Sequence, residues 1–86
     1  MATGEINSEV RDQAAATREV RRAFASRPGV TLDDLDGLTV SGGGWWFNLR
    51  PSNTEPLLRL NAEAADEATL AGLRDEVLGI VRGRAG

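Results

Sequence analysis

The sequence predicts a single α+β domain in which a mainly antiparallel sheet of four to five strands carries two helices on one face. Apolar residues follow a helical period in two separated segments, one near the start and one at the end of the chain. Between these segments the period shortens to that of strands, which are separated by short turns. A length of 86 residues leaves room for one domain over 1–86, with an ordered core expected from about 4 to 83.

The first part of the chain is expected to form a strand, a helix and an acidic turn. Residues Glu5 to Val10 alternate enough to predict a short strand. From about Asp12 to Ser26 the apolar side chains recur on one face of a helix, which Pro28 and Gly29 then end. The acidic stretch Val30 to Leu35 is assigned no strand.

The second part is expected to form strands joined by turns and then a helix. The stretch Leu35 to Leu38 resembles a turn, and three consecutive glycines, Gly42 to Gly44, are typical of a hairpin connection. The strands are expected over Leu38–Ser41, Trp45–Leu49 and Leu57–Glu63, and the second helix over Asp66–Arg82 with Asp66 as its N-cap.

Three consecutive aromatic residues lie in one predicted strand, so their side chains are expected to alternate between its two faces. Trp45 and Phe47 face one side of the predicted strand and Trp46 faces the other. Because helices often cover both faces of a sheet, we expect Trp46 to be buried as well. Exposure of Trp46 as a stacking platform is the alternative.

Composition excludes several classes of function. With no histidine and no cysteine, the chain lacks the commonest general base, the commonest metal ligand and any disulfide. Thirteen acids against ten arginines give a net charge of −3, which argues against a nucleic-acid partner. No apolar run approaches a membrane span, so we expect no membrane partner and a cytoplasmic location.

The segment Arg50-Pro51-Ser52-Asn53-Thr54-Glu55-Pro56 concentrates anion-binding groups in one loop. Guanidinium, hydroxyl, carboxamide and backbone N–H groups together suit the acceptor oxygens of a phosphate. The two prolines restrict the backbone, so little entropy is lost when a ligand binds. From residue spacing alone, an ordinary turn in which Arg50 pairs with a surface carboxylate explains this segment as well as an anion site does.

The acidic residues predict no catalytic or metal site. Asp33, Asp34 and Asp36 lie close together, but they lack the glycine and distal glutamate of a calcium loop. A solvated turn is the better interpretation. Glu55 would be repelled by a bound phosphate, so we expect it to point away, toward Arg59 or a neutral part of a ligand.

The residues Gly4–Ser8, Leu35–Leu38 and above all Trp45–Arg59 resemble the C-terminal domain of the α-D-phosphohexomutases, in the phosphomannomutase/phosphoglucomutase branch. The resemblance extends from about Gly4 to Gly83 and implies a TATA-binding-protein-like fold. Such enzymes have four domains and interconvert hexose 1-phosphate and hexose 6-phosphate through a bisphosphate intermediate. Their phosphoserine and magnesium loop lie in other domains, and neither motif occurs here.

The resemblance also implies roles for individual residues. Arg50, Ser52, Asn53 and Thr54 match the loop that binds the non-transferring phosphate, and Arg59 and Glu55 are secondary candidates. No catalytic residue, metal ligand or cofactor is implied in this domain, whereas Mg²⁺ and a hexose 1,6-bisphosphate activator are implied for the full-length enzyme.

The implied partners are a phosphorylated hexose and three further domains, so we expect this chain to be an excised fragment that is inactive alone. Asn53, where the phosphoglucosamine branch usually has glycine, favours mannose or glucose phosphates. The triple glycine departs from the usual Asp-Gly of this hairpin. A free-standing module that binds phosphorylated ligands or a protein, using Trp46 and the loop, is the alternative hypothesis.

Overall fold

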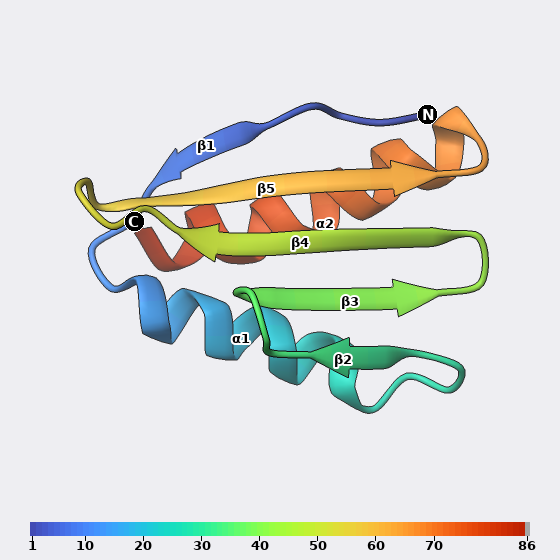
Figure 1. Ribbon diagram of the computed structural model, residues 1–86, viewed down its shortest axis with the longest axis horizontal. Helices are drawn as coiled ribbons and strands as arrows, with labels where there is room; N and C mark the ends of the chain where they lie inside the picture. Colours follow the sequence, from blue (N-terminus) through green and yellow to red (C-terminus); the bar gives the residue numbers. More distant parts are fainter. Residues whose placement is uncertain (86) are drawn as a thin grey trace.

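The computed structural model describes residues 1–85, with side chains up to residue 83, and forms an antiparallel sheet with both helices on one face (Figure 1). Along the chain the elements are β1 (Ile6–Glu9), α1 (Gln13–Ala25), β2 (Thr31–Asp33), β3 (Leu38–Gly42), β4 (Trp45–Pro51), β5 (Leu57–Ala64) and α2 (Glu67–Ala85). In space the strands lie in the order β1-β5-β4-β3-β2, and every neighbouring pair is antiparallel. The predicted α+β fold class is therefore confirmed.

Both helices begin at an aspartate that accepts a hydrogen bond from the first turn. The Asp12 side chain accepts from the backbone N–H of Ala15 at 2.9 Å, and Asp66 accepts from the N–H of Thr69 at 2.8 Å. These caps satisfy N–H groups that have no partner inside a helix. The predicted helices therefore begin where the sequence placed them.

The core lies between the helices and the inner face of the sheet. Phe24 of α1 meets Phe47 of β4 edge to face, with ring centroids 5.1 Å apart. Trp45 stacks parallel to Phe47 at 6.4 Å. Aromatic contacts of this kind add about 0.5–1.5 kcal/mol to the burial of the rings. Further buried side chains of the core are Val20, Leu38, Val40, Leu49, Leu58, Leu60, Val77 and Val81.

Three features differ from expectation. Residues Thr31 to Asp33 form a short edge strand. The sequence did not predict it, because three residues of mixed burial are too few to show a strand pattern. Thr3, which precedes the expected ordered core, donates its N–H to the carbonyl of Ala62 at 3.0 Å. The expected burial of Trp46 is wrong, because both helices lie behind the sheet and this side chain is 39% exposed.

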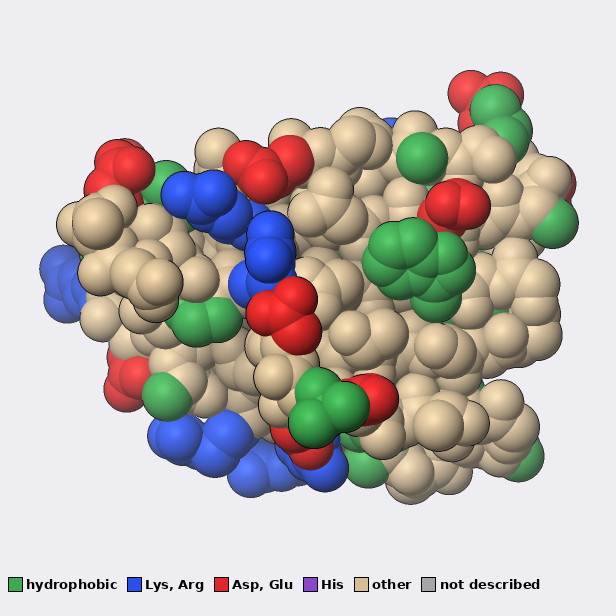
Figure 2. Space-filling view, in the orientation of Figure 1, with side chains coloured by type: hydrophobic (Ala, Val, Ile, Leu, Met, Phe, Trp, Pro, Cys, Tyr) green, Lys and Arg blue, Asp and Glu red, His purple; other side chains and the backbone are tan. Residues whose placement is uncertain are grey.

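The face of the sheet that is turned away from the helices, here called the open face, carries mostly polar side chains. Figure 2 shows this face, with basic and acidic side chains gathered toward the end where β4 finishes and β5 begins. Residues directly opposite each other on β4 and β5 form three outward pairs: Arg50 with Arg59, Asn48 with Asn61, and Trp46 with Glu63.

Candidate functional site

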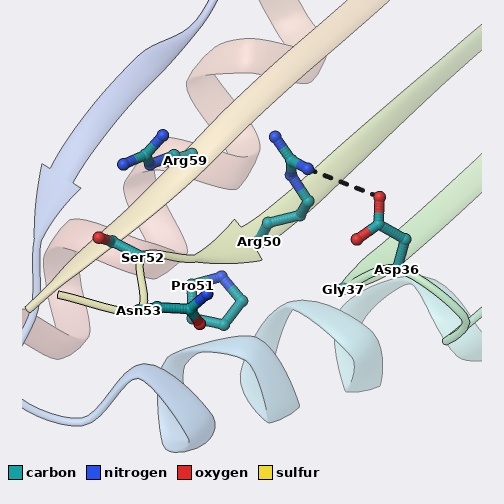
Figure 3. Close-up of a pocket in the computed structure, with 7 residues that line it drawn as sticks. All are labelled: Asp36, Gly37, Arg50, Pro51, Ser52, Asn53 and Arg59. Carbon is teal, nitrogen blue, oxygen red and sulfur yellow. Dashed lines mark ion pairs between the residues drawn. The ribbon is translucent and has the colours of Figure 1, made fainter. Parts of the chain in front are cut away.

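A pocket of about 340 Å³ lies where β4 ends, on the open face of the sheet (Figure 3). Three parts of the chain form it: the turn before β3, the end of β4 with the loop that follows, and β5. Its lining residues are Asp36, Gly37, Arg50, Pro51, Ser52, Asn53 and Arg59. Antiparallel pairing of β3, β4 and β5 thus brings together side chains that are far apart in the sequence.

Two arginines face each other across the strands at this pocket. Arg50 on β4 is the register partner of Arg59 on β5, so their Cβ atoms share one face of the sheet. Like charges placed directly opposite destabilise a sheet unless an anion lies near them. Each arginine has one carboxylate nearby: Asp36 is 3.6 Å from Arg50, and Glu5 is 3.9 Å from Arg59.

The two ion pairs leave donor capacity unused. All four side chains are at least one-third exposed, so each pair stabilises the fold by at most about 1 kcal/mol. The Nε atom of Arg59 is buried and has no hydrogen-bond partner among the residues described. A buried N–H without a partner costs free energy, which an acceptor from a ligand would recover.

The loop from Ser52 to Pro56 folds around the hydroxyl of its first residue. Ser52 Oγ accepts the backbone N–H groups of Thr54 and Glu55, both at 3.3 Å, and the Ser52 N–H donates to the carbonyl of Leu57 at 2.9 Å. Because the oxygen accepts both bonds, the hydroxyl proton remains free to donate. The N–H of Asn53 has no partner within residues 1–85.

The underside of the loop is held by the segment between β1 and α1. The backbone N–H of Val10 donates to the carbonyl of Pro56 at 2.8 Å. The side chain of Gln13, the first residue of α1, donates to three further carbonyls, those of Ser52 and Glu55 in the loop and of Leu57 at the start of β5. Sequence reasoning missed Gln13, because no local pattern connects it to a loop about forty residues later.

The turn before β3 fixes the stem of Arg50. Gly37 has φ +70°, and a Cβ atom there would lie 2.6 Å from Arg50 Cγ and 2.6 Å from the carbonyl oxygen of Leu49. Asn48 holds the same turn by donating its side-chain N–H to the carbonyl of Asp36 at 2.7 Å. Only glycine therefore allows this close approach of the turn to Arg50.

The structure gathers some of the predicted site residues and separates others. Arg50, Ser52, Asn53 and Arg59 line the pocket, whereas Thr54 and Glu55 do not. The carboxylate near Arg59 is Glu5, and not Glu55. Arg50 is near a surface carboxylate, as expected for an ordinary turn, and it also lines a pocket, as expected for an anion site.

The residues that the structure describes contain neither a cluster of potential metal ligands nor a membrane-spanning helix. Over residues 1–85, no group of three or more histidine, cysteine, aspartate or glutamate side chains is placed to hold a metal ion. Within the same residues, no helix has the length and apolar character needed to cross a membrane.

Comparison with known proteins identifies the family. The profile of the phosphoglucomutase/phosphomannomutase C-terminal domain matches residues 5–80, which is most of the chain. The chain belongs to this family. The phosphomannomutase of Methanocaldococcus jannaschii is 43% identical to it over 79 residues, which cover 92% of this chain and 17% of that protein. A phosphohexose mutase of Xanthomonas campestris is 44% identical over 82 residues, which cover 94% of this chain and 18% of that protein.

A solved structure agrees with the family assignment. The phosphoglucomutase/phosphomannomutase family protein of Burkholderia thailandensis superposes with a TM-score of 0.71 at 27% sequence identity. The alignment covers all of this chain and 19% of that protein. The chain is thus similar to the C-terminal domain of a phosphohexomutase and spans less than one-fifth of the relatives it matches.

Proposed function

We propose that this chain is the phosphate-binding C-terminal domain of a phosphomannomutase or phosphoglucomutase, and that its pocket holds the phosphate that is not being transferred. The observation that carries the proposal is that Arg50 and Arg59, opposite each other on β4 and β5, line one pocket together with Ser52. Two guanidinium groups offer forked donors to a dianion and lose their mutual repulsion when it binds.

The loop supplies neutral donors to the same anion. Ser52 and Asn53 both line the pocket, so the hydroxyl proton of Ser52 and the free N–H of Asn53 would complement the charged donors. Thr54 contributes when its N–H turns from Ser52 Oγ, a bond of 3.3 Å that is long enough to exchange for a phosphate oxygen. Glu55 lies outside the pocket, so among the lining residues only Asp36 carries a like charge that would oppose the anion.

The parent enzyme would interconvert hexose 1-phosphate and hexose 6-phosphate through a bisphosphate. The names of the relatives, phosphomannomutase and phosphohexose mutase, support this activity. The phosphoserine, Mg²⁺ and groups that recognise the sugar would belong to parts of the enzyme outside this chain. This domain would close over the substrate and exclude water during the reaction, in the cytoplasm.

Titration of the labelled chain with inorganic phosphate and with a hexose 6-phosphate tests the proposal. We expect the amide signals of Ser52, Asn53 and Thr54 to shift as ligand is added and to reach a plateau when the site is saturated. The variant Arg50→Ala lacks one charged donor, and we expect it to bind at least tenfold more weakly. An unshifted loop at millimolar phosphate would refute the proposal, as would equal affinity of the variant.

A second candidate, a free-standing module that binds a protein, is favoured by one observation. Leu35, in the turn before β3, is 93% exposed and Trp46 on the open face is 39% exposed, and such apolar side chains often anchor protein contacts. The kinetics of a full-length enzyme that contains this domain test the first candidate. An increased KM in its Arg50→Ala variant supports the phosphate site, whereas unchanged kinetics contradict it and leave the module as the remaining candidate.

A further inference from the structure

A loop that binds an anion must present its N–H groups and turn its carbonyl oxygens away. Carbonyl oxygens carry partial negative charge, so each one that faces a phosphate weakens the binding. Each of these oxygens also needs a hydrogen-bond partner wherever water is excluded. A residue that donates hydrogen bonds to the carbonyl oxygens of the Ser52–Pro56 loop therefore determines which donors of the loop remain available to a ligand.

The side chain of Gln13 makes most of these hydrogen bonds. Gln13 Nε2 donates to the carbonyl oxygens of Leu57 at 2.7 Å, Glu55 at 3.1 Å and Ser52 at 3.3 Å. The amide has two protons for three acceptors, so at least one proton is shared. With the bond from Val10 N–H to Pro56, the segment after β1 binds four carbonyls around this loop.

We propose that Gln13 is the positioning residue of the phosphate site. By binding the loop carbonyls from the side of α1, it fixes a loop conformation in which the N–H of Asn53 and the hydroxyl of Ser52 are left for the anion. This inference rests on the proposed phosphate-binding function of the same loop. Gln13 does not line the pocket, so it acts through the loop and does not contact the ligand.

The chemistry of the position requires a carboxamide. Glutamate has the same shape but only acceptors, so it would repel the three carbonyls. Methionine has nearly the same length and no donors. Asparagine keeps the donors but is one methylene shorter, which is too short to reach the same three oxygens from the start of α1. The side chain starts from the first residue of α1, so its reach to the three oxygens is set by its own length.

The test compares Gln13→Met and Gln13→Asn with the control Asp12→Ala. The control weakens the same helix end by removing its cap, but it leaves the loop bonds of Gln13 intact. Inorganic phosphate is the probe, followed at the amides of Ser52 to Thr54. A second measurement without phosphate records ¹⁵N relaxation of the loop and hydrogen exchange of the Ser52 N–H.

We expect both Gln13 variants to bind phosphate roughly tenfold more weakly, because three neutral hydrogen bonds to the loop are lost or misplaced. Their loop amides should also become more mobile, and Ser52 should exchange faster than global unfolding explains. Asp12→Ala should lose thermal stability while its phosphate affinity does not fall. Arg50→Ala should lose phosphate affinity while its loop mobility stays that of the unaltered chain.

Unaltered phosphate affinity together with unaltered loop mobility in Gln13→Met would overturn the inference. Weakened affinity with an unaltered loop would overturn it as well, since positioning through the loop predicts both effects. If the unaltered chain binds no phosphate, the proposed function fails. Loop mobility alone then decides the role of Gln13: a looser loop in Gln13→Met supports that role, and an unchanged one refutes it.

Discussion

Replacing Gly37 with alanine tests the close approach of the turn before β3 to the stem of Arg50. The new Cβ would lie 2.6 Å from Arg50 Cγ and from the carbonyl oxygen of Leu49, and φ is +70°. A left-handed conformation costs a non-glycine residue about 1–2 kcal/mol. Overpacking adds about 1–3 kcal/mol. The expected loss of unfolding free energy is therefore about 2–5 kcal/mol, accompanied by weaker phosphate binding as Arg50 is displaced.

Two other glycines provide matched controls. Gly29 has φ +76° and nothing within 4 Å of its would-be Cβ, so its alanine variant isolates the backbone term of about 1–2 kcal/mol. Gly43 has an ordinary φ and open space, so its alanine variant should change stability by less than ~0.5 kcal/mol. The gain from a stiffer unfolded chain is common to all three and cancels in the comparison.

Urea denaturation and thermal melting of the three variants measure these differences. For a domain of this size each 1 kcal/mol shifts Tm by roughly 4–8 °C, so the Gly37 variant should melt at least about 8 °C lower than the unaltered chain. If Gly37→Ala were as stable as Gly29→Ala, the contact with Arg50 would impose no constraint. If Gly37→Ala were as stable as Gly43→Ala, a positive φ at residue 37 would not be required either.

Three further outcomes follow from the ion pairs and caps. Asp36→Asn removes the carboxylate 3.6 Å from Arg50, so we expect phosphate to bind up to about fivefold more tightly in an NMR titration; weaker binding would mean that Asp36 assists the site. Arg27→Met breaks the two bonds between Arg27, which follows the end of α1, and Glu76 of α2; both side chains are partly exposed, so urea denaturation should show a loss of unfolding free energy of about 0.5–1.5 kcal/mol. Adding Glu76→Gln to Arg27→Met should cause little further loss, because both changes remove the same interaction. Hydrogen bonds from the backbone and hydroxyl of the first turn lower the pKa of Asp66 below 3.8, so the stabilisation that it provides is complete above that value and is lost as the pH falls through its folded pKa. Melting curves should therefore show the gap between the unaltered chain and Asp66→Ala narrowing below about pH 4, and a gap that widened in acid would contradict the cap.

The elements of the fold were predictable where one physical rule dominated. Alternation identified β5, the helical stripe ending at Val81 identified α2, and Asp66 as N-cap marked the start of α2. The edge strand β2 was missed because three residues bring too little burial to produce a pattern. Burial of Trp46 was wrongly expected because no local signal tells whether helices cover one face of a sheet or both.

The candidate site was predictable only where its residues are contiguous. The loop from Arg50 to Pro56 shows its donors in the sequence itself. The approach of Asp36 and Glu5 depends on the register of β3 against β4 and of β1 against β5, which no single segment encodes. Gln13 illustrates the same limit, since a helical position says nothing about what a long side chain reaches in another loop.

The bonds from Gln13 to the loop also bear on the order of events in folding. They span 39 to 44 residues, so they form only after β1 has docked beside β5 and brought the start of α1 with it. Closing so long a stretch of chain costs more entropy, and is therefore slower, than forming the β4–β5 hairpin that carries the loop from Arg50 to Pro56. The hairpin would thus exist before its loop has the geometry to bind an anion, and competence for phosphate would mark the completion of folding.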